Sequence, residues 1–164
     1  MLFKDSFTNA DRDILNSSDI MKGFKKDELQ LILKKCRLKK INAGEDIIQE
    51  GDAGIGLYIV LSGKVEIYLP QENKLGEKRP TEVKIGKLES GSCFGEYSLI
   101  DDRKVSASVK ATTDVRICYF SSFDFGEISE ENDKIGKILY KNLLDLLVKR
   151  LRKTNKELDL VHLQ

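Results

Sequence analysis

The sequence has few of the residues on which catalytic and metal sites are usually built. Its 164 residues include no tryptophan and a single histidine, His162. Histidine is the most frequent general base and a common zinc ligand, so metal sites and histidine-based catalysis lack their usual parts. No nucleophile beside a base and no pair of carboxylates at a suitable spacing can be assembled either. We therefore expect no enzyme, no metal and no required cofactor.

Cysteine is also scarce, and long apolar runs are missing. Cys36, Cys93 and Cys118 are odd in number and far apart, and two of them lie in apolar surroundings, which favours reduced core thiols over a disulfide framework. The first residues include charged side chains and no apolar run long enough for a secretion signal, and no later segment approaches the length of a membrane span. We expect a cytoplasmic protein without a membrane partner.

An excess of charge of one sign is absent as well. The chain has 28 Lys and Arg residues against 27 Asp and Glu, a formal net charge of +1, so no global field attracts nucleic acid or membrane. Hydrophobic residues make up 40% and charged residues 34%, which argues against disorder. The length suits one domain with its own core.

Residues 1–40 are expected to form a leader and a helical segment. Phe3, Phe7, Ile14 and Leu15 could dock a short helix, but the weak pattern of residues 1–18 favours a loosely held leader. Ser18 and Lys26-Asp27 are candidate caps of a helix that continues to Leu38. Lys and Arg are frequent between residues 22 and 40, but aromatic residues are not interleaved with them, so we expect a solvated helix face and no nucleic-acid site.

Residues 41–120 change from a helical to an alternating period. Val65, Ile67 and Leu69 fall on one side of a strand, and frequent glycines divide the region into short strands. This spacing is typical of an antiparallel β-barrel or sandwich, and with helical segments before and after it predicts an α+β domain. Pro70 and Pro80 bracket a charged loop, which we expect to be an exposed flap between two strands.

Residues 121–164 are expected to be helical throughout. Within this region, apolar residues recur three and four apart over nearly three heptads and form a seam that Thr154 interrupts. The apolar residues of the seam are Leu144, Leu147, Leu151, Leu158 and Val161. We expect Ile135 to Leu147 to pack on the barrel. Beyond Lys149 the other faces are rich in Lys and Arg, so the seam predicts a partner helix and hence a homodimer.

The segment from Gly91 to Ala111 is the best candidate for a binding site. It reads GSCFGEYSLIDDRKVSASVKA and predicts a strand, one helical turn and a second strand. Glycine lets the backbone approach a ligand closely, and the free N–H groups of a short helical turn can hold an anion. A carboxylate such as Glu96 accepts hydrogen bonds from sugar hydroxyls but repels a phosphate placed directly on it.

With Gly44, Gly51-Asp52, Tyr58 and Gly63 in order before it, Phe94-Gly95-Glu96 resembles the cyclic nucleotide-binding domain family. The resemblance covers roughly residues 21–120 and implies a bacterial catabolite-activator-like sensor domain without the DNA-binding domain. It also implies the form of the α+β fold: an antiparallel, jelly-roll-like β-barrel, a double-stranded β-helix, between N-terminal helices and a long C-terminal helix. It implies cAMP or cGMP as the ligand, and a long helix that forms a parallel dimer in bacterial regulators.

The resemblance also implies roles for individual residues. Phe94 opens the phosphate-binding cassette, and Glu96 would meet the ribose 2′-hydroxyl. The backbone of Gly95, Tyr97 and Ser98 would face the phosphate. Ser106 would add a hydroxyl and an N–H group, and Ala107 follows it in the predicted set.

One departure from the family pattern bears directly on ligand binding. The position of the arginine that pairs with the phosphate in the family is occupied by Val105, which cannot neutralise an anion. Two residues earlier on the same strand face, Arg103 could reach into the pocket. We favour instead a solvent-exposed pairing of Arg103 with Asp101 or Asp102.

Two functions remain open on these residues. In the first, the chain is a regulatory sensor in which a cyclic nucleotide or another small anion, bound weakly or not at all because of Val105, sets the position of the C-terminal helix. In the second, the pocket is degenerate and the chain acts by ligand-independent dimerisation or by docking an unknown downstream protein.

Overall fold

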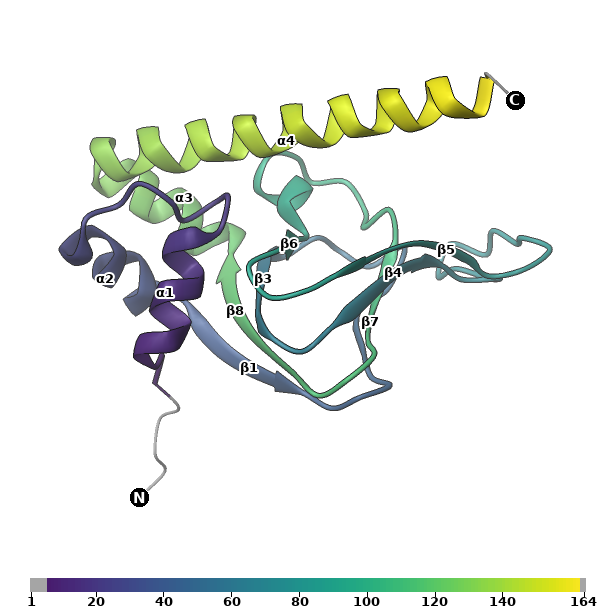
Figure 1. Ribbon diagram of the computed structural model, residues 1–164, viewed down its shortest axis with the longest axis horizontal. Helices are drawn as coiled ribbons and strands as arrows, with labels where there is room; N and C mark the ends of the chain where they lie inside the picture. Colours follow the sequence, from purple (N-terminus) through teal and green to yellow (C-terminus); the bar gives the residue numbers. More distant parts are fainter. Residues whose placement is uncertain (1–5, 163–164) are drawn as a thin grey trace.

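The computed structural model describes residues 6–162 and places helices against one of two antiparallel sheets (Figure 1). The N-terminal helices are α1 (Asn9–Ser17) and α2 (Lys26–Lys35). The strands are β1 (Arg37–Ile41), β2 (Asp46–Ile48), β3 (Gly56–Ser62), β4 (Val65–Leu69), β5 (Val83–Leu88), β6 (Cys93–Phe94), β7 (Ser108–Ala111) and β8 (Val115–Ser121). A 3-10 turn, η1 (Glu96–Leu99), follows β6, and the helices α3 (Ser122–Glu131) and α4 (Asp133–His162) follow β8.

The eight strands form two four-stranded sheets. The first sheet has the order β1-β8-β3-β6 and the second has the order β2-β7-β4-β5, with every pair antiparallel. Strands distant in sequence are therefore neighbours, as in a jelly roll. The predicted α+β class with a jelly-roll-like antiparallel framework is confirmed.

Strand β3 lies at the centre of the core because both of its faces are covered. Leu57, Ile59 and Leu61 pack with the helices in one cluster, whereas Tyr58 and Val60 pack between the two sheets in another. All five side chains are buried. Burial on both faces explains why this strand is apolar throughout instead of alternating.

The N-terminal region is a docked helix, and the expectation of a loosely held leader is wrong for the described part of it. Asp11 of α1 is 1% exposed and accepts hydrogen bonds of 2.8 and 2.7 Å from Nη1 and Nη2 of Arg116 on β8. Asp11 also accepts a 2.8 Å bond from the backbone N–H of Thr8, closing a capping box. Asp11 and Arg116 are 105 residues apart in the sequence, so their bidentate ion pair leaves no signal in a local sequence pattern. Phe3 lies outside the described residues.

Two local expectations in this region also need correction. Ser18 does not begin a helix: it is the C-cap of α1, and its hydroxyl donates to the carbonyl oxygen of Leu15. Leu38 is not helical, because β1 begins at Arg37 and pairs with β8. β1 is an edge strand, where charged side chains are tolerated, so its Lys-rich sequence resembled a solvated helix.

The loop at residues 70–82 is more firmly attached than an exposed flap. Arg79 donates two hydrogen bonds, of 2.9 and 2.8 Å, to the carboxylate of Glu50, which is 7% exposed. Asn73 is 6% exposed and its amide oxygen accepts bonds from the backbone N–H groups of Leu75 and Glu77. We call β4, β5 and this loop the β4–β5 arm, which extends from the body of the molecule (Figure 1).

The C-terminal region contains a break that periodicity did not predict. α3 ends at Glu131, and the side-chain oxygen of Asn132 accepts a 3.0 Å bond from Ile135 N at the start of α4. The residues of α4 that pack on the core are Ile135, Leu139, Leu143 and Leu146. Leu144, expected to pack on the barrel, is 63% exposed.

The first half of α4 is fixed to the N-terminal segment. Asn142 is 5% exposed and donates hydrogen bonds of 3.0 and 2.9 Å to the carbonyl oxygens of Ile20 and Lys22. Lys149 donates a 2.8 Å bond to Asp19. The second half of the helix, residues 150–162, extends past these contacts over the β4–β5 arm (Figure 1), and we call it the distal segment.

Replacing Asp11 with alanine tests the attachment of α1. The change leaves the partly buried guanidinium of Arg116 without its partner, so we expect the free energy of unfolding to fall by about 3 kcal/mol. The exposed Asp13 on the same helix supplies the control, and Asp13→Ala should change stability by less than about 0.5 kcal/mol. Urea denaturation followed by circular dichroism measures both, and equal effects would contradict the assignment.

The same pair predicts a pH dependence. Burial alone would raise the pKa of Asp11, but hydrogen bonds from Arg116 and Thr8 hold this pKa below its usual value. A carboxyl with a lowered folded-state pKa stabilises the fold above its unfolded pKa, and the contribution disappears as pH falls through the folded-state value. The stability difference between wild type and Asp11→Asn should therefore be largest near neutral pH and shrink in acid.

Candidate functional site

The turn between β6 and η1 depends on glycine at position 95. Gly95 has φ of +78°, a left-handed conformation that side chains with a Cβ rarely adopt. A Cβ at this position would also lie 2.6 Å from the carbonyl oxygen of Gly56 and 3.0 Å from the ring of Tyr58. The Ser98 hydroxyl lies within hydrogen-bonding distance of two carbonyl oxygens, 2.7 Å from that of Gly95 and 3.1 Å from that of Gly56. The turn is therefore pressed directly against the start of β3.

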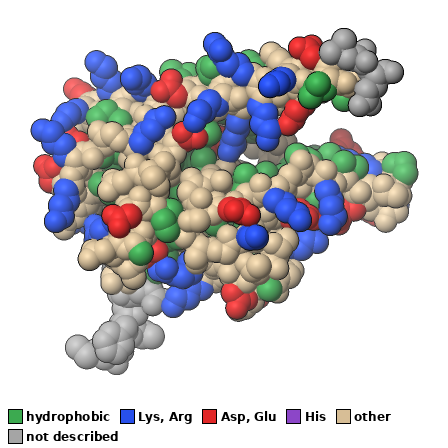
Figure 2. All heavy atoms as spheres, viewed as in Figure 1, with side chains coloured by type: hydrophobic (Ala, Val, Ile, Leu, Met, Phe, Trp, Pro, Cys, Tyr) green, Lys and Arg blue, Asp and Glu red, His purple; other side chains and the backbone are tan. Residues whose placement is uncertain are grey.

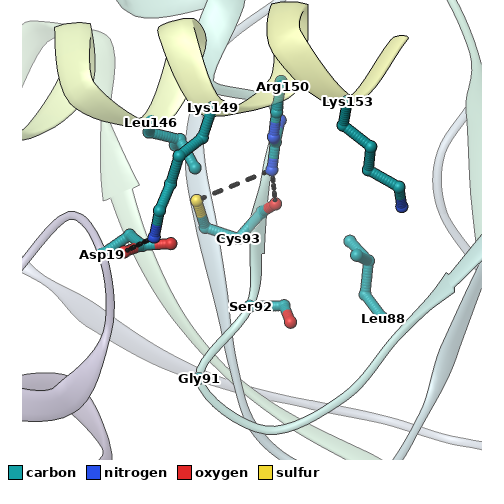
Figure 3. A pocket seen from close by; sticks show the side chains of 9 residues that line it. All are labelled: Asp19, Leu88, Gly91, Ser92, Cys93, Leu146, Lys149, Arg150 and Lys153. Carbon is teal, nitrogen blue, oxygen red and sulfur yellow. Dashed lines mark hydrogen bonds and ion pairs between the residues drawn. The ribbon is translucent and has the colours of Figure 1, made fainter. Parts of the chain in front are cut away.

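Glu96, the first residue of η1, is held by a side chain from α4. Its side chain is 3% exposed, and Arg150 Nη1 donates to Glu96 Oε1 while Nη2 donates to the carbonyl oxygen of Cys93. Figure 3 shows Arg150 reaching from α4 to Cys93, beside the Lys149–Asp19 pair. Burial acts to lower the pKa of Arg150, but the Glu96 carboxylate raises it above its usual value, so the guanidinium stays charged. A buried carboxylate with one such partner makes the position of α4 depend on η1.

A cavity of about 810 Å³ lies between the sheets, the segment 94–107 and α4. All nine residues predicted to bind ligand line it: Phe94, Gly95, Glu96, Tyr97, Ser98, Arg103, Val105, Ser106 and Ala107. The structure thus brings the whole predicted set around one space, whose size is within the usual range for small-molecule sites. Figure 2 shows the corresponding hollow between the distal segment and the β4–β5 arm.

Sequence reasoning missed the walls contributed by other elements. Ile48 of β2, Ile67 of β4 and Ile85 of β5 line the cavity, and α4 adds four residues: Arg150, Lys153, Thr154 and Glu157. The sequence pattern places Arg150 and Lys153 on a basic surface beside the dimer seam and Thr154 in the seam itself, and it makes no prediction for Glu157. Their place in the wall follows from how α4 packs, so no local pattern could have identified it.

Val105 and Arg103 take different positions in this cavity. Val105 is half-buried, and its backbone is fixed by hydrogen bonds to Asp52 O (2.9 Å) and from Gly51 N (2.8 Å). The Arg103 side chain is 89% exposed, with Nε 3.8 Å from the Asp101 carboxylate. Arg103 therefore lies at the rim and pairs with Asp101 in solvent, and it does not reach the place that Val105 leaves uncharged.

Burial keeps two titratable side chains beside the cavity in their protonated forms. Burial raises the pKa of Cys93 to about 12, so its thiol stays protonated at neutral pH. Burial likewise raises the pKa of Tyr58 to about 12. Within residues 6–162, no group of three or more His, Cys, Asp or Glu side chains could hold a metal, and the helices of this part of the chain include none that is long and apolar enough to cross a bilayer.

Alanine at position 95 should disrupt this site more than alanine at a matched glycine. Gly91 also has a positive φ, of +87°, but a Cβ there would meet nothing within 4 Å. We expect Gly91→Ala to cost about 1–2 kcal/mol from the backbone conformation alone, and Gly95→Ala about 2 kcal/mol more because of the clash with Gly56 and Tyr58. Chemical denaturation measures the difference, and equal destabilisation would show that η1 does not depend on this close approach.

Known proteins are similar to this chain in both sequence and fold. The cyclic AMP receptor protein of Thermus thermophilus is 31% identical over 147 residues, which are 90% of this chain and 63% of the relative. The cAMP-dependent protein kinase type II regulatory subunit of Drosophila melanogaster is 33% identical over 100 residues, 61% of this chain and 25% of the relative. The crystal structure of the Thermus thermophilus catabolite activator protein matches with a TM-score of 0.73 and 30% identity, over 88% of this chain and 63% of that one.

The chain thus spans less than two thirds of the length of each of these proteins. A profile of the cyclic nucleotide-binding domain matches residues 38–132, more than half of the chain. The match includes β1 to β8 and α3, so it covers the walls of the cavity other than α4. On this evidence the resemblance seen in the sequence is confirmed, and the chain belongs to the cyclic nucleotide-binding domain family.

Proposed function

We propose that this chain is a regulatory module in which a small ligand in the cavity sets the position of α4. The observation that carries the proposal is the contact of Arg150 with Glu96 and Cys93, because it joins the helix to the turn that forms the cavity wall. A ligand that changes the surroundings of Glu96 changes the energy of this contact. Binding and helix position are then linked, since the ligand favours whichever helix position suits it.

The proposal treats the cavity as a binding site without a catalytic role. Among residues 6–162, the hydrogen-bond partners of the Ser98 hydroxyl are two backbone carbonyl oxygens and no side-chain base, and the Cys93 thiol is held protonated by burial. The matched relatives fit this role, since one is named a receptor protein and another a regulatory subunit. A cytoplasmic location remains a prediction from the sequence.

For a cyclic nucleotide, we propose that Glu96 meets the ribose 2′-hydroxyl and that the turn at Gly95 faces the phosphate. Among residues 6–162 the hydrogen bonds to Glu96 involve Oε1 only, so Oε2 is available to accept from a hydroxyl. Val105 leaves the phosphate without its cation. Loss of one partner of a buried ion pair costs on the order of 3–5 kcal/mol, which is about two to three or more decades in Kd. We therefore propose that cAMP and cGMP bind weakly or not at all.

Arginine at position 105 should restore binding of a cyclic phosphate. The backbone bonds of Val105 use only its N–H and carbonyl groups, so Val105→Arg retains them. We expect the Kd for cAMP to fall by about two decades, because the new guanidinium neutralises the phosphate at the cavity. Isothermal titration calorimetry of wild type and variant gives the comparison.

Thr81→Arg adds the same charge at an exposed position of the 70–82 loop and controls for net charge. It should leave the Kd for cAMP within about twofold of wild type, since an isolated exposed charge interacts weakly through solvent. Equal gains in cAMP affinity in both variants, or no gain in Val105→Arg, would contradict the role proposed for position 105.

A second function, dimerisation through α4, is supported by a separate observation. Four apolar residues of the predicted seam are more than half exposed: Leu144 at 63%, Leu151 at 61%, Leu158 at 53% and Val161 at 69%. Leu147, also in the seam, is half-buried against the core of its own domain. We propose that a second copy of α4 covers this face. Because α4 also lines the cavity, ligand and partner helix would act on the same element.

Aspartate at position 151 should dissociate the proposed dimer. Leu151→Asp places a charge in an apolar helix interface, so sedimentation velocity at micromolar protein should change from dimer to monomer. Leu160→Asp is the matched control: Leu160 is 57% exposed, and nine residues from Leu151 place it about 180° around the helix, away from the seam. A wild-type chain that is already monomeric would contradict dimerisation through α4, but it would not bear on the proposed binding of a ligand in the cavity.

A further inference from the structure

The inner surface of the cavity is apolar. Tyr58 and Phe94 are each 3% exposed and stack in parallel with ring centroids 5.0 Å apart, and Val109 is 2% exposed. Half-buried apolar residues complete this surface, which we call the floor: Ile48, Ile67, Val105 and Ala107. With valine at position 105, the part of the wall beside the Gly95 turn offers hydrocarbon where an anion would need a cation.

The cations that line the cavity lie at its edge. Four of them are exposed, and we call this group the rim: Lys87 of β5, Arg103 and Lys104 of the segment before β7, and Lys153 of α4. Arg150 is the fifth, and its guanidinium is already bonded to Glu96 and Cys93. The cavity also has three acidic residues, Glu96, Asp101 and Glu157, so five cations against three carboxylates give it a formal charge of +2.

Lys153 is the rim cation best placed to meet a ligand. Figure 3 draws an adjoining pocket that shares Leu88, Arg150 and Lys153 with the cavity, and in it the side chain of Lys153 extends from α4 toward Leu88 of β5. Its contact with Glu157, at 3.7 Å, joins two largely exposed side chains, at 77% and 62%. An exposed pair of this kind contributes little stability, so Lys153 can change partners easily.

From this distribution of charge we infer that the cavity is built for an amphipathic anion, with an apolar body on the floor and one carboxylate, sulfonate or phosphate group at the rim beside Lys153. The inference rests on the proposed function only in taking the cavity as a ligand site. A cyclic nucleotide needs the reverse arrangement, with its anionic group beside the Gly95 turn. Apolar surface leaving water supplies the attraction to the floor, and the rim cations determine the sign of the charge that is accepted.

The same inference connects the ligand to α4 by a direct contact. Lys153 lies on the distal segment, whose nearest fixed contacts to the body are those of Lys149 and Arg150. An anion at the rim therefore bridges the β-sheets and the distal segment. In a cyclic nucleotide site of the kind the sequence resembles, the phosphate would be held within the barrel instead.

Anilinonaphthalene sulfonate is a suitable probe, because it joins an apolar ring system to one anionic group and fluoresces more strongly in apolar surroundings. We expect the full chain to bind it saturably at one site, with a single Kd, under native conditions well below the unfolding transition. Decanoate should displace the probe, whereas acetate, which has the charge without the apolar body, should not. Decanol, which has the body without the charge, should displace it several-fold less effectively than decanoate.

Two variants test the floor and the rim separately. Val105→Arg should weaken probe binding by about tenfold or more, since it places a charge on the apolar floor, in the same variant that gains affinity for cAMP. Lys153→Gln should weaken it by about two- to fivefold, an effect that added salt reduces. Lys156→Gln is the control for the rim, because Lys156 is exposed on α4 but does not line the cavity, and it should leave the Kd unchanged. Circular dichroism of each variant confirms folding.

The inference is overturned if decanoate does not displace the probe, if Val105→Arg binds the probe as tightly as wild type, or if Lys153→Gln and Lys156→Gln behave alike. These outcomes are separable from failure of the proposed function. If Val105→Arg gains cAMP affinity while the probe results are negative, the cavity is a ligand site of another chemistry. If the variant gains nothing and no probe binds, the cavity is not a ligand site.

Discussion

The structure depends on how the carboxylate of Glu96 is compensated. A charge at 3% exposure needs a partner, and among residues 6–162 its ion-pair partner is Arg150 on α4. The same guanidinium bonds the carbonyl oxygen of Cys93, so one side chain closes the cavity and holds the helix against β6. Because a buried carboxylate left alone is strongly unfavourable, the helix and the turn stabilise each other. The regulatory role proposed for the cavity depends on this contact.

The first sheet makes that arrangement rigid. β3 and β8 are buried on both faces, between the helices on one side and the second sheet on the other. The Gly95 turn packs closely against Gly56 and Tyr58 of β3. The position of η1 is therefore fixed by β3, a strand buried on both faces. The β4–β5 arm and the distal segment of α4 extend from this body (Figure 1). These two elements form the opening of the cavity.

The sequence predicted what is encoded locally and missed what depends on distant contacts. The resemblance to the cyclic nucleotide-binding domain family identifies most of the segment 94–107, because the motif residues follow one another within a few positions, and all nine predicted residues line the cavity. Asp101 and Lys104 of the same segment also line it and were not predicted. Arg150 and Lys153 were missed as wall residues because their place depends on Asn142 and Lys149, which fix α4 to residues 19–22. α1 was underestimated for the same reason, since the partner of Asp11 is on β8.

The anchoring of α4 at Asn142 and Lys149 makes its distal segment a lever. The thirteen residues from Arg150 to His162 span twelve steps of about 1.5 Å, or about 18 Å, and a tilt of about 10° at the base would carry the tip roughly 3 Å. Three cavity residues of α4, Arg150, Lys153 and Thr154, lie near the base of this segment. Leu158 and Val161 lie toward its tip. A displacement of α4 that is smaller than the length of a chemical bond near the base of this segment would therefore correspond to a shift of the helix tip comparable to the width of a methyl group. Under the proposed function, this geometry would let a weakly bound molecule have a large structural effect.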